Sequence, residues 1–371
     1  MNEPIRVLML FTIMNRGGAE SMVMNYYRHI DRTKVQFDFM VHRQERGAYD
    51  DEIEALGGKI YRMLPLRPPF IAYKKQIKQF FDEHPEYLII HGHCSESGYF
   101  VYKEATKRGV PHIIAHAHNS HALFDLKWFF RTWFKHQMRP YITQGFTCGD
   151  EAAKWLFGNE LAKKAIFQRN AIETWNYSFN SEVRIQKRKE LGIDNQTLVI
   201  GHIGRFEKQK NHSFLIDIFE RIVARQSDSK LLLIGGTGDL MDGIKQKVHD
   251  LSLDEKVIFA GNRSDVPQLL QTMDIFLFPS FMEGMSLSML EAQCAGLPLI
   301  ASDTIPHEIA ITDLITFLPL NENPDFWAEK VLSYELHPER RKEYPQQIVE
   351  AGYDIQQNAE WLQNYYLSLV R

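Results

Sequence analysis

A chain of 371 residues is long enough for two domains, and its 44% hydrophobic and 24% charged residues are typical of an ordinary globular protein. The net charge of −4 gives no overall attraction to nucleic acid, which excludes binding through a generally basic surface. Three scattered cysteines, no apolar run of membrane-spanning length and no signal-peptide pattern lead us to expect a cytoplasmic protein.

The first half of the chain alternates short apolar strands with helical stretches. Near-continuous apolar strands separated by helices predict a parallel sheet that is covered on both faces. The predicted strands are 5–11, 36–41, 59–63, 87–93 and 112–118, and the predicted helices are 20–29, 50–56, 73–83 and 97–107.

The second half repeats this pattern from residue 198 onward. Its predicted strands are 198–203, 230–234, 256–260, 275–278 and 297–301, and its predicted helices are 212–225, 240–251, 266–272 and 286–295. The polar stretch 176–194 suits a domain connection with a surface helix, and 355–370 has the apolar spacing of an amphipathic helix. We therefore predict an α/β protein with two doubly wound, Rossmann-like domains, 1–174 and 175–354, whose strand ends face a central cleft.

The stretch 278–302 carries the strongest chemical signal. An apolar strand ends at Pro279, a glycine loop follows, and a helix begins at Ser286, which we expect to cap it. The free N–H groups at this helix start attract an anion, and a carboxylate stands on either side of them. A sugar nucleotide has the matching pattern, with a diphosphate between two sugars that carry hydroxyl groups. We predict Glu283 as a catalytic residue of this site and five residues as donor-binding, which are Gly284, Met285, Ser286, Leu287 and Glu291.

Two cations follow the strand 198–203. Arg205 leaves the strand end, and Lys210 precedes a helix that Asn211 is placed to cap. Two cations converging on a strand-end loop suit a diphosphate whose charge grows as a sugar–phosphate bond breaks. Taken alone, such residues are also common in surface loops that bind nothing.

Glycines follow three other predicted strands. Gly236 and Gly238, after 230–234, allow the backbone to approach a ligand closely, although the third glycine of a dinucleotide fingerprint is missing. Gly17 and Gly18 open the first helix and form a second N-terminus that favours anions. Gly261 precedes Asn262 and Arg263 after the strand 256–260.

Four of the fifteen histidines end two predicted strands. His91 and His93 end one, and His116 and His118 end the next. They are either packed residues or functional ones. A metal site is disfavoured, because no carboxylate or cysteine accompanies them at ligand spacing.

The helical stretch 127–139 carries cations at Lys127, Arg131, Lys135 and Arg139, with aromatic residues between them. A basic-aromatic amphipathic helix suits docking on an anionic membrane. The alternative is a helix that packs its aromatic side chains into the first domain.

These motifs and their order resemble the family-4 glycosyltransferases, retaining enzymes of the GT-B fold. The stretch Glu283-Gly-Met-Ser-Leu-Ser-Met-Leu-Glu-Ala292 is similar to the Glu-x7-Glu motif of that family. The opening stretch 14–25 and Gly352-Tyr-Asp resemble in particular the EpsF-type enzymes of bacterial exopolysaccharide and capsule synthesis. The resemblance implies a final helix, 355–371, that crosses back to complete the first domain.

The resemblance also implies roles for single residues. Arg205 and Lys210 would hold the leaving diphosphate, Gly236 and Gly238 would line the nucleotide pocket, and Asn262 and Arg263 would contact the base. Gly17 and Gly18 would lie beside the donor phosphate. His118, with His116 as runner-up, would touch the transferred sugar, while His93 would help to bind the acceptor.

The expected activity is a hexosyltransferase reaction that needs no metal or other cofactor. A nucleotide-sugar donor, most simply a UDP-sugar, would pass its sugar with retention to a saccharide acceptor, lipid-linked and at the inner face of the membrane. Two alternatives remain: a sugar-nucleotide epimerase of the same fold, and a non-catalytic sugar-nucleotide-binding subunit. The donor sugar, the base, the acceptor and the oligomeric state are not readable from the sequence.

Overall fold

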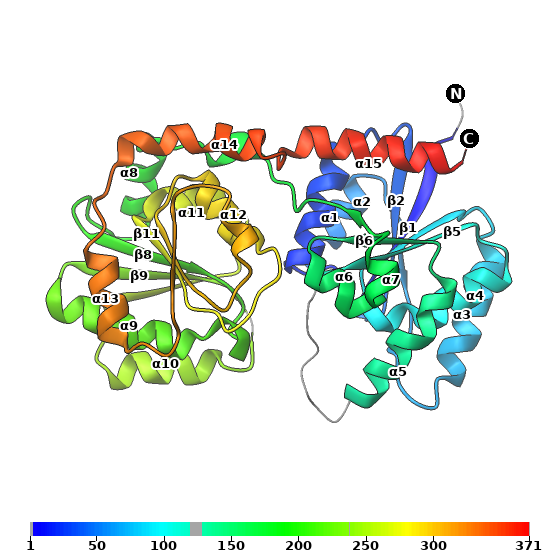
Figure 1. Cartoon of the computed structure of the whole chain (residues 1–371), viewed down its shortest axis with the longest axis horizontal. Coiled ribbons are helices and arrows are strands. Elements are labelled where there is room, and N and C mark those ends of the chain that lie inside the picture. The colour runs from blue at the N-terminus through cyan, green and yellow to red at the C-terminus, as the bar shows by residue number, and fades with distance from the viewer. Residues whose placement is uncertain (1–2, 119–127, 237, 371) are drawn as a thin grey trace. The chain divides into compact units, whose positions relative to one another are not determined.

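The computed structural model describes residues 3–118, 128–236 and 238–370, and the chain divides into two compact units (Figure 1). The first unit comprises Met1–Ala171 and Ile355–Arg371, and the second comprises Ile172–Asp354. The boundary predicted between residues 174 and 175 falls inside a short 3-10 helix of the second unit, η3 (Thr174–Tyr177).

The first unit is built, over its described residues, on a sheet of seven strands in the order β3-β2-β1-β4-β5-β6-β7, all paired in parallel. Each residue of the inner strand β2 is buried, including the polar Gln36 and Asp38, as expected for a strand that is covered on both faces. The strands are β1 (Ile5–Phe11), β2 (Val35–Val41), β3 (Ile60–Arg62), β4 (Ile89–Gly92), β5 (His112–Ala117), β6 (Gln144–Thr147) and β7 (Ile166–Phe167).

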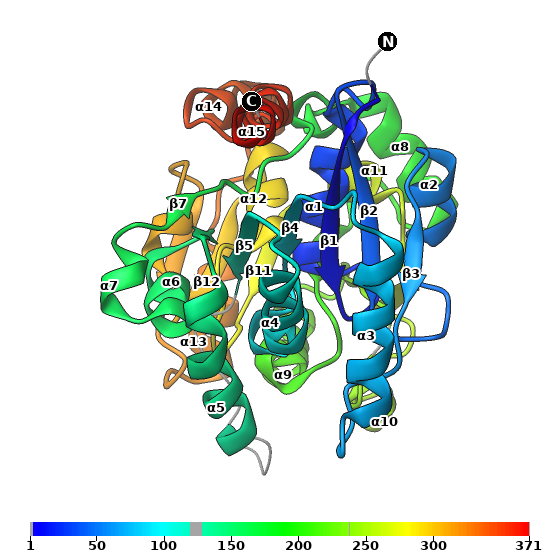
Figure 2. The same ribbon diagram turned by 90° about the vertical axis from the view of Figure 1, so that its right-hand side faces the viewer.

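Helices cover both faces of this sheet (Figure 2). Leu8 and Leu10 pack with Ile77 and Tyr102 on one face, and on the other face Tyr27 stacks on Phe37 at 5.2 Å between ring centres. The helices are α1 (Gly18–His29), α2 (Asp50–Ala55), α3 (Ile71–Glu83), α4 (Tyr99–Lys107), α5 (Trp128–Met138), α6 (Asp150–Phe157), α7 (Asn159–Ala162) and α15 (Ile355–Leu369).

The last helix, α15, belongs to the first unit although it follows the second in sequence. Tyr366 is fully buried, and its ring meets Phe37 of β2 edge to face at 5.9 Å. Gln363 accepts a hydrogen bond from the backbone N–H of Asp31 at 2.8 Å. These contacts explain why 355–370 has the apolar spacing of an amphipathic helix.

The second unit contains, within the described part of the chain, a parallel sheet in the order β10-β9-β8-β11-β12-β13. Its core places Ile200, Leu215, Leu231 and Trp327 in one buried cluster. The strands are β8 (Leu198–Ile203), β9 (Ser229–Ile234), β10 (Val257–Gly261), β11 (Ile275–Phe278), β12 (Leu299–Ser302) and β13 (Ile315–Leu318). The helices are α8 (Ser181–Glu190), α9 (His212–Arg225), α10 (Met241–Asp250), α11 (Val266–Thr272), α12 (Leu287–Cys294), α13 (Pro324–Leu332) and α14 (Tyr344–Glu350).

The predicted fold class is confirmed, but three short strands at or next to the edge of a sheet were missed. β6 is rich in small and polar residues, β7 has two residues, and β13 stands alone after a loop. Short edge strands carry too little apolar pattern to be recognised locally, and only pairing with a neighbour defines them. No helix among the described residues is long and apolar enough to cross a membrane.

Helix α8 lies at the surface, as predicted, and its one buried residue, Arg188, anchors it to the second sheet. The guanidinium of Arg188 is 1% exposed, lies 2.7 Å from the Asp274 carboxylate and donates to the carbonyl oxygen of Thr197 at 3.0 Å. Asp274 in turn accepts from the backbone N–H of Val199 in β8 at 2.8 Å. A buried ion pair therefore ties the helix to the start of two strands.

Breaking this pair should destabilise the second unit. Arg188→Ala leaves Arg184 as the guanidinium partner of Asp274, at 2.5 Å, but it removes the donor to the buried carbonyl oxygens of Thr197 and Thr272, so we expect the free energy of unfolding to fall by about 1–3 kcal/mol. Urea unfolding followed by circular dichroism measures it. Lys189→Ala, at an exposed position of the same helix, is the control and should change little. Equal effects of the two substitutions would contradict the anchoring role.

Candidate active site

The second sheet reverses its strand order between β8 and β11. From β8 the chain continues to β9 on one side, and from β11 it continues to β12 on the other. Loops that follow neighbouring strands at such a reversal diverge and leave a binding crevice at the carboxyl edge of the sheet. The loop after β8 contains Arg205 and Lys210, and the loop after β11 contains Glu283.

Glu283 and Lys210 form a buried ion pair at this point. The Lys210 ammonium donates to Glu283 Oε1 at 2.8 Å, and the two side chains are only 17% and 7% exposed. The same ammonium lies 4.7 Å from the centre of the Phe278 ring, at the end of β11. A carboxylate and a cation are thus held together beside the start of α12, where amide groups favour an anion.

Hydrogen bonds between the two loops fix this arrangement. Gln209 donates to the carbonyl oxygen of Met282 at 2.8 Å and accepts, through its own backbone, from Phe281 at 2.9 Å. Asn211 has left-handed backbone angles (φ 53°, ψ 41°) and donates its side-chain amide to the Pro279 carbonyl oxygen at 3.1 Å. Both loops are therefore positioned by backbone groups.

Two residues predicted to cap helices through their side chains do not form these hydrogen bonds. Ser286 and Asn211 stand at the N-cap positions of α12 and α9, but neither side chain accepts from its helix in the described structure. Asn211 instead spans to the β11 loop, and the Ser286 hydroxyl lies 3.1 Å from that of Ser288. A tertiary partner therefore competes for the side chain of Asn211, and a neighbour in the sequence competes for that of Ser286.

Arg205 does not lie with Lys210 against Glu283. Its guanidinium is 58% exposed and pairs with Glu207 at 2.9 Å. The prediction of two converging cations is therefore met by Lys210 alone in this structure. Arg205 remains within its loop with an exposed side chain.

Glu291 lies on α12, whereas Glu283 lies in the loop before it. The hydrogen-bond partner of Glu291 comes from a segment far away in the sequence. The Tyr177 hydroxyl donates to Glu291 Oε1 at 2.9 Å. Burial raises the pKa of Glu291 to about 7, and the Tyr177 hydrogen bond opposes this rise only in part. The group can therefore act as a hydrogen-bond acceptor or, when protonated, as a donor near neutral pH.

The glycines after β9 serve the packing of loops. Gly235 and Gly238 have φ values of 152° and 149°, and a Cβ at Gly238 would lie 2.2 Å from the Phe206 carbonyl oxygen. A Cβ at Gly236 would lie 2.6 Å from the Asn262 side chain. These close approaches within the unit require glycine at both positions, and the place of Gly236 and Gly238 in a nucleotide pocket stays a prediction.

Arg263 is engaged by a carboxylate at the same edge. Its guanidinium binds Asp265 with two hydrogen bonds of 2.7 Å. Any contact of Arg263 with a base would have to compete with this pair, whereas Asn262 lies against Gly236 beside the Gly235–Gly238 turn.

In the first unit, Gly17 and Gly18 lie at the start of α1, after β1. Gly17 is the N-cap in an extended conformation, and a Cβ there would lie 2.4 Å from Glu20 Oε2. A Cβ at Gly18 would meet no described atom within 4 Å. The Glu20 carboxylate therefore occupies part of the helix start that we predicted to be open to an anion.

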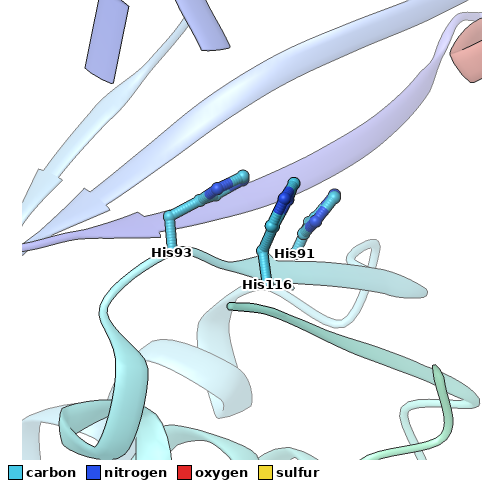
Figure 3. Close-up of side chains that lie close together, drawn as sticks. All are labelled: His91, His93 and His116. Atoms are coloured by element: carbon cyan, nitrogen blue, oxygen red, sulfur yellow. The ribbon is translucent and has the colours of Figure 1, made fainter. Parts of the chain in front are cut away.

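The strand-end histidines form one stack beside β4 and β5 (Figure 3). His93 Nδ1 lies 2.8 Å from His118 Nε2, and His91 Nδ1 lies 2.6 Å from the Tyr366 hydroxyl. His116 is fully buried, whereas His118 is partly exposed. Burial lowers the pKa of His91 to about 3 and that of His118 to about 4, so both rings are neutral.

The nitrogens of His91, His93 and His116 lie within 4.8 Å of one another, close enough to hold a metal ion. In the described structure both ring nitrogens of His116 lack a hydrogen-bond partner. However, the rings of His91 and His116 are inclined by only 14° and those of His91 and His93 by 24°. A ring nitrogen binds a metal in the plane of its ring, so these nearly parallel rings direct their lone pairs side by side (Figure 3).

The predicted basic stripe of 127–139 is divided by the fold. Lys127 lies outside the described residues. The Lys135 ammonium lies 4.6 Å from the Trp155 ring centre, and Arg139 donates to the carbonyl oxygen of Leu156, both on α6. Phe134 and Met138 are buried, while Phe129 and Trp133 are exposed. The C-terminal half of the stripe therefore contacts α6, and docking of this helix on a membrane stays a prediction.

One residue and one pairing were missed by sequence reasoning. Tyr177, which was not a candidate, meets Glu291 across 114 positions, and the candidates His93 and His118 meet each other across 25. Neither pair has a local spacing that a motif would record. A tyrosine at a domain boundary and an alternating pair of histidines were visible, but their partners were not.

Two family models match the chain. A model described as "Glycosyltransferase Family 4" matches residues 16–152, and one described as "Glycosyl transferases group 1" matches residues 183–353. The chain is 32% identical over 369 residues to the "Putative glycosyltransferase EpsF" of Bacillus subtilis (strain 168), covering 97% of this chain and 96% of that protein.

Two further similarities are informative. Over 120 residues, 32% of this chain and 31% of the relative, it is 35% identical to an Escherichia coli "UDP-Gal:alpha-D-GlcNAc-diphosphoundecaprenol alpha-1,3-galactosyltransferase". Its fold is similar to that of Anabaena HepE, solved in complex with UDP and glucose. The TM-score is 0.80 at 17% identity, over 98% of this chain and 100% of that one.

Two parallel doubly wound units, with a Glu-x7-Glu helix at the strand reversal of the second, define a glycosyltransferase of the GT-B fold. The chain belongs to glycosyltransferase family 4 and is close to the EpsF-type enzymes.

The raised pKa of Glu291 predicts a pH-dependent stability. Between its ordinary value of 4.5 and about 7, the folded state holds a proton that the unfolded state has released. Stability should therefore fall as the pH rises through this window, and Glu291→Gln should remove that part of the slope. Urea unfolding at a series of pH values measures it. Glu308→Gln, at an exposed position, is the control, and equal slopes for both variants and the parent would contradict the assignment.

Proposed function

We propose that this protein is a retaining hexosyltransferase that moves a sugar from a UDP-sugar to a lipid-linked saccharide in bacterial exopolysaccharide or capsule synthesis. The observation that carries the proposal is the buried Lys210–Glu283 pair at the start of α12, with Glu291 further along the same helix. The similarity to EpsF and to a galactosyltransferase whose name specifies a UDP-sugar and a lipid-linked acceptor supports the choice of substrates.

In this proposal each group of the second unit has a separate task. The N–H groups of Gly284, Met285, Ser286 and Leu287 bind the diphosphate, Glu283 accepts from hydroxyl groups of the transferred sugar, and Glu291 accepts from the ribose. Lys210 gives up part of its contact with Glu283 to neutralise the departing phosphate, and Arg205 folds over from its exposed position to assist.

The reaction breaks the bond between the anomeric carbon and the phosphate oxygen, and forms a bond from that carbon to the acceptor oxygen. The acceptor proton leaves with the nucleoside diphosphate. His118, which is neutral and held by His93 in the first unit, contacts the transferred sugar, while Gly17 and Gly18 lie beside the donor phosphate. No step requires a metal ion, because Lys210, Arg205 and the amide groups supply the positive charge.

A lipid-linked acceptor implies contact with a membrane, and we propose peripheral binding at its inner face, as predicted from 127–139. The remaining partners are the nucleotide-sugar donor and the saccharide acceptor. Which hexose is transferred follows from contacts of loop residues with its hydroxyl groups.

Slow hydrolysis of the donor tests activity and stereochemistry together. Water replaces the acceptor, so a panel of UDP- and GDP-sugars needs no knowledge of the natural acceptor. We expect one UDP-α-hexose to release UDP and the α-anomer, seen by proton NMR before mutarotation, with equal rates in EDTA. Release of the β-anomer would contradict retention, and loss in EDTA with recovery on adding a divalent ion would contradict metal independence. Tight UDP binding without turnover in any condition would favour a non-catalytic subunit.

The cations should act on the transition state more than on donor binding. We expect Lys210→Gln or Arg205→Gln to lower kcat for donor hydrolysis by about 100-fold or more, with a much smaller change in UDP affinity measured by calorimetry. Lys208→Gln is the matched control, because Lys208 is exposed in the same loop. Thermal unfolding verifies that the variants are folded. Small and equal losses in both quantities would identify a structural pair.

A further inference from the structure

Helices α3, α4 and α5 of the first unit enclose a groove on its outer surface. Figure 2 shows α4 between α3 and α5, and the groove between them has a volume of about 880 Å³. Cations from two helices line it, and each helix contributes one pair that is four residues apart and one neighbouring cation. They are Lys74, Lys75 and Lys78 of α3, and Lys103, Lys107 and Arg108 of α4 and its end.

The charge of this groove is largely unbalanced. Glu104 is the one carboxylate among its lining residues, all of them in the described structure, and it lies 2.6 Å from Arg108 and 3.4 Å from Lys107. No ion pair within the described chain engages Lys74, Lys75, Lys78 or Lys103. A net positive surface therefore persists on a protein whose total charge is −4.

Aromatic rings form the floor and one edge of the groove. The Lys74 ammonium lies 4.9 Å from the Phe100 ring centre and that of Lys103 lies 5.6 Å from Tyr99, so both cations are held over rings. On α5, Phe129 is 69% and Trp133 45% exposed. Large apolar side chains exposed at the edge of a cationic groove mark a binding surface.

We propose that the α3–α4–α5 groove docks on an anionic phospholipid bilayer. Lipid phosphates lie between the lysines of α3 and α4, and Phe129 and Trp133 enter the boundary between headgroups and acyl chains. The exposed Ile71 at the start of α3 adds a second apolar contact. This inference rests on the membrane contact of the proposed function. It assigns the electrostatic attraction to cations of α3 and α4 and not to those of the 127–139 helix.

The pairing of lysines with exposed apolar side chains favours a bilayer over nucleic acid. A bilayer offers both a negative surface and an apolar interior, and so accounts for Ile71 and Phe129 together with the cations. A soluble polyanion would account only for the charge and the ring faces. Polyanion binding is therefore the competing outcome of the test.

Vesicle co-sedimentation with the full chain decides between them. We expect binding to phosphatidylcholine vesicles only when they contain phosphatidylglycerol, weakening as salt increases. Replacing Lys74, Lys75, Lys78 and Lys103 together by Gln should weaken it at least about tenfold, because each lysine near such a surface contributes to the attraction. Lys59, Lys154, Lys163 and Lys164 changed together to Gln make the control, since they are exposed in the same unit and remove the same charge.

The aromatic edge has its own readout. Vesicles should shift the tryptophan emission of the parent protein to shorter wavelength, and Phe129→Ser with Trp133→Ser should weaken binding at high salt. Equal binding by the groove variant and the control variant, binding to neutral vesicles alone, or tighter binding to single-stranded RNA than to anionic vesicles would each overturn the proposal. Donor hydrolysis without vesicles separates the two proposals. The rate of donor hydrolysis should be the same in the groove variant and in the parent protein. If neither protein hydrolyses any donor while the parent still binds vesicles, the transferase function is contradicted and the docking proposal is not.

Discussion

Parallel strand pairing is the constraint on which the rest of this protein depends. Parallel strands need a crossover after each strand, so helices cover both sheet faces and the strand interiors become apolar. All the loops with chemical content must then follow carboxyl ends of strands. In the second unit the order reverses between β8 and β11, and this reversal brings the Lys210 loop to the Glu283 loop. In the first unit the parallel pairing of β4 with β5 brings His93 and His118, which follow these strands, next to each other.

The Lys210–Glu283 pair shows how the site stays stable without a ligand. A lone buried carboxylate or ammonium would be costly, whereas the pair, resting on Phe278, compensates both charges. In the proposed reaction a diphosphate competes for Lys210 and so leaves the Glu283 carboxylate to accept from hydroxyl groups. Glu291 has no such cation beside it in the described structure. Its hydrogen-bond partner is Tyr177, and burial raises its pKa to about 7. The two carboxylates of one motif thus have different partners, an ammonium for Glu283 and a phenol hydroxyl for Glu291.

In the first unit, the side chains of α5 that pack inward and the cations exposed beside α5 belong to different helices. On α5 the residues Phe134 and Met138 pack inward and Lys135 and Arg139 contact α6, which leaves the aromatic edge of Phe129 and Trp133 outside. The cations that accompany this edge come from α3 and α4. The amphipathic pattern of a single helix therefore could not show that Lys135 and Arg139 contact α6, because these partners lie elsewhere in the sequence.

The sequence by itself determined the strand and helix alternation, and it located β1, β8 and β11 with the bounds that the structure has. It also placed Glu283 and Glu291 around a helix start, because turn, cap and periodicity signals are local. Only the tertiary structure decided that Lys210 and not Arg205 meets Glu283, that Tyr177 meets Glu291, and that β6 and β13 join the sheets. Those contacts join segments tens of residues apart, and their energies depend on burial and on competing partners, which no short stretch of sequence contains.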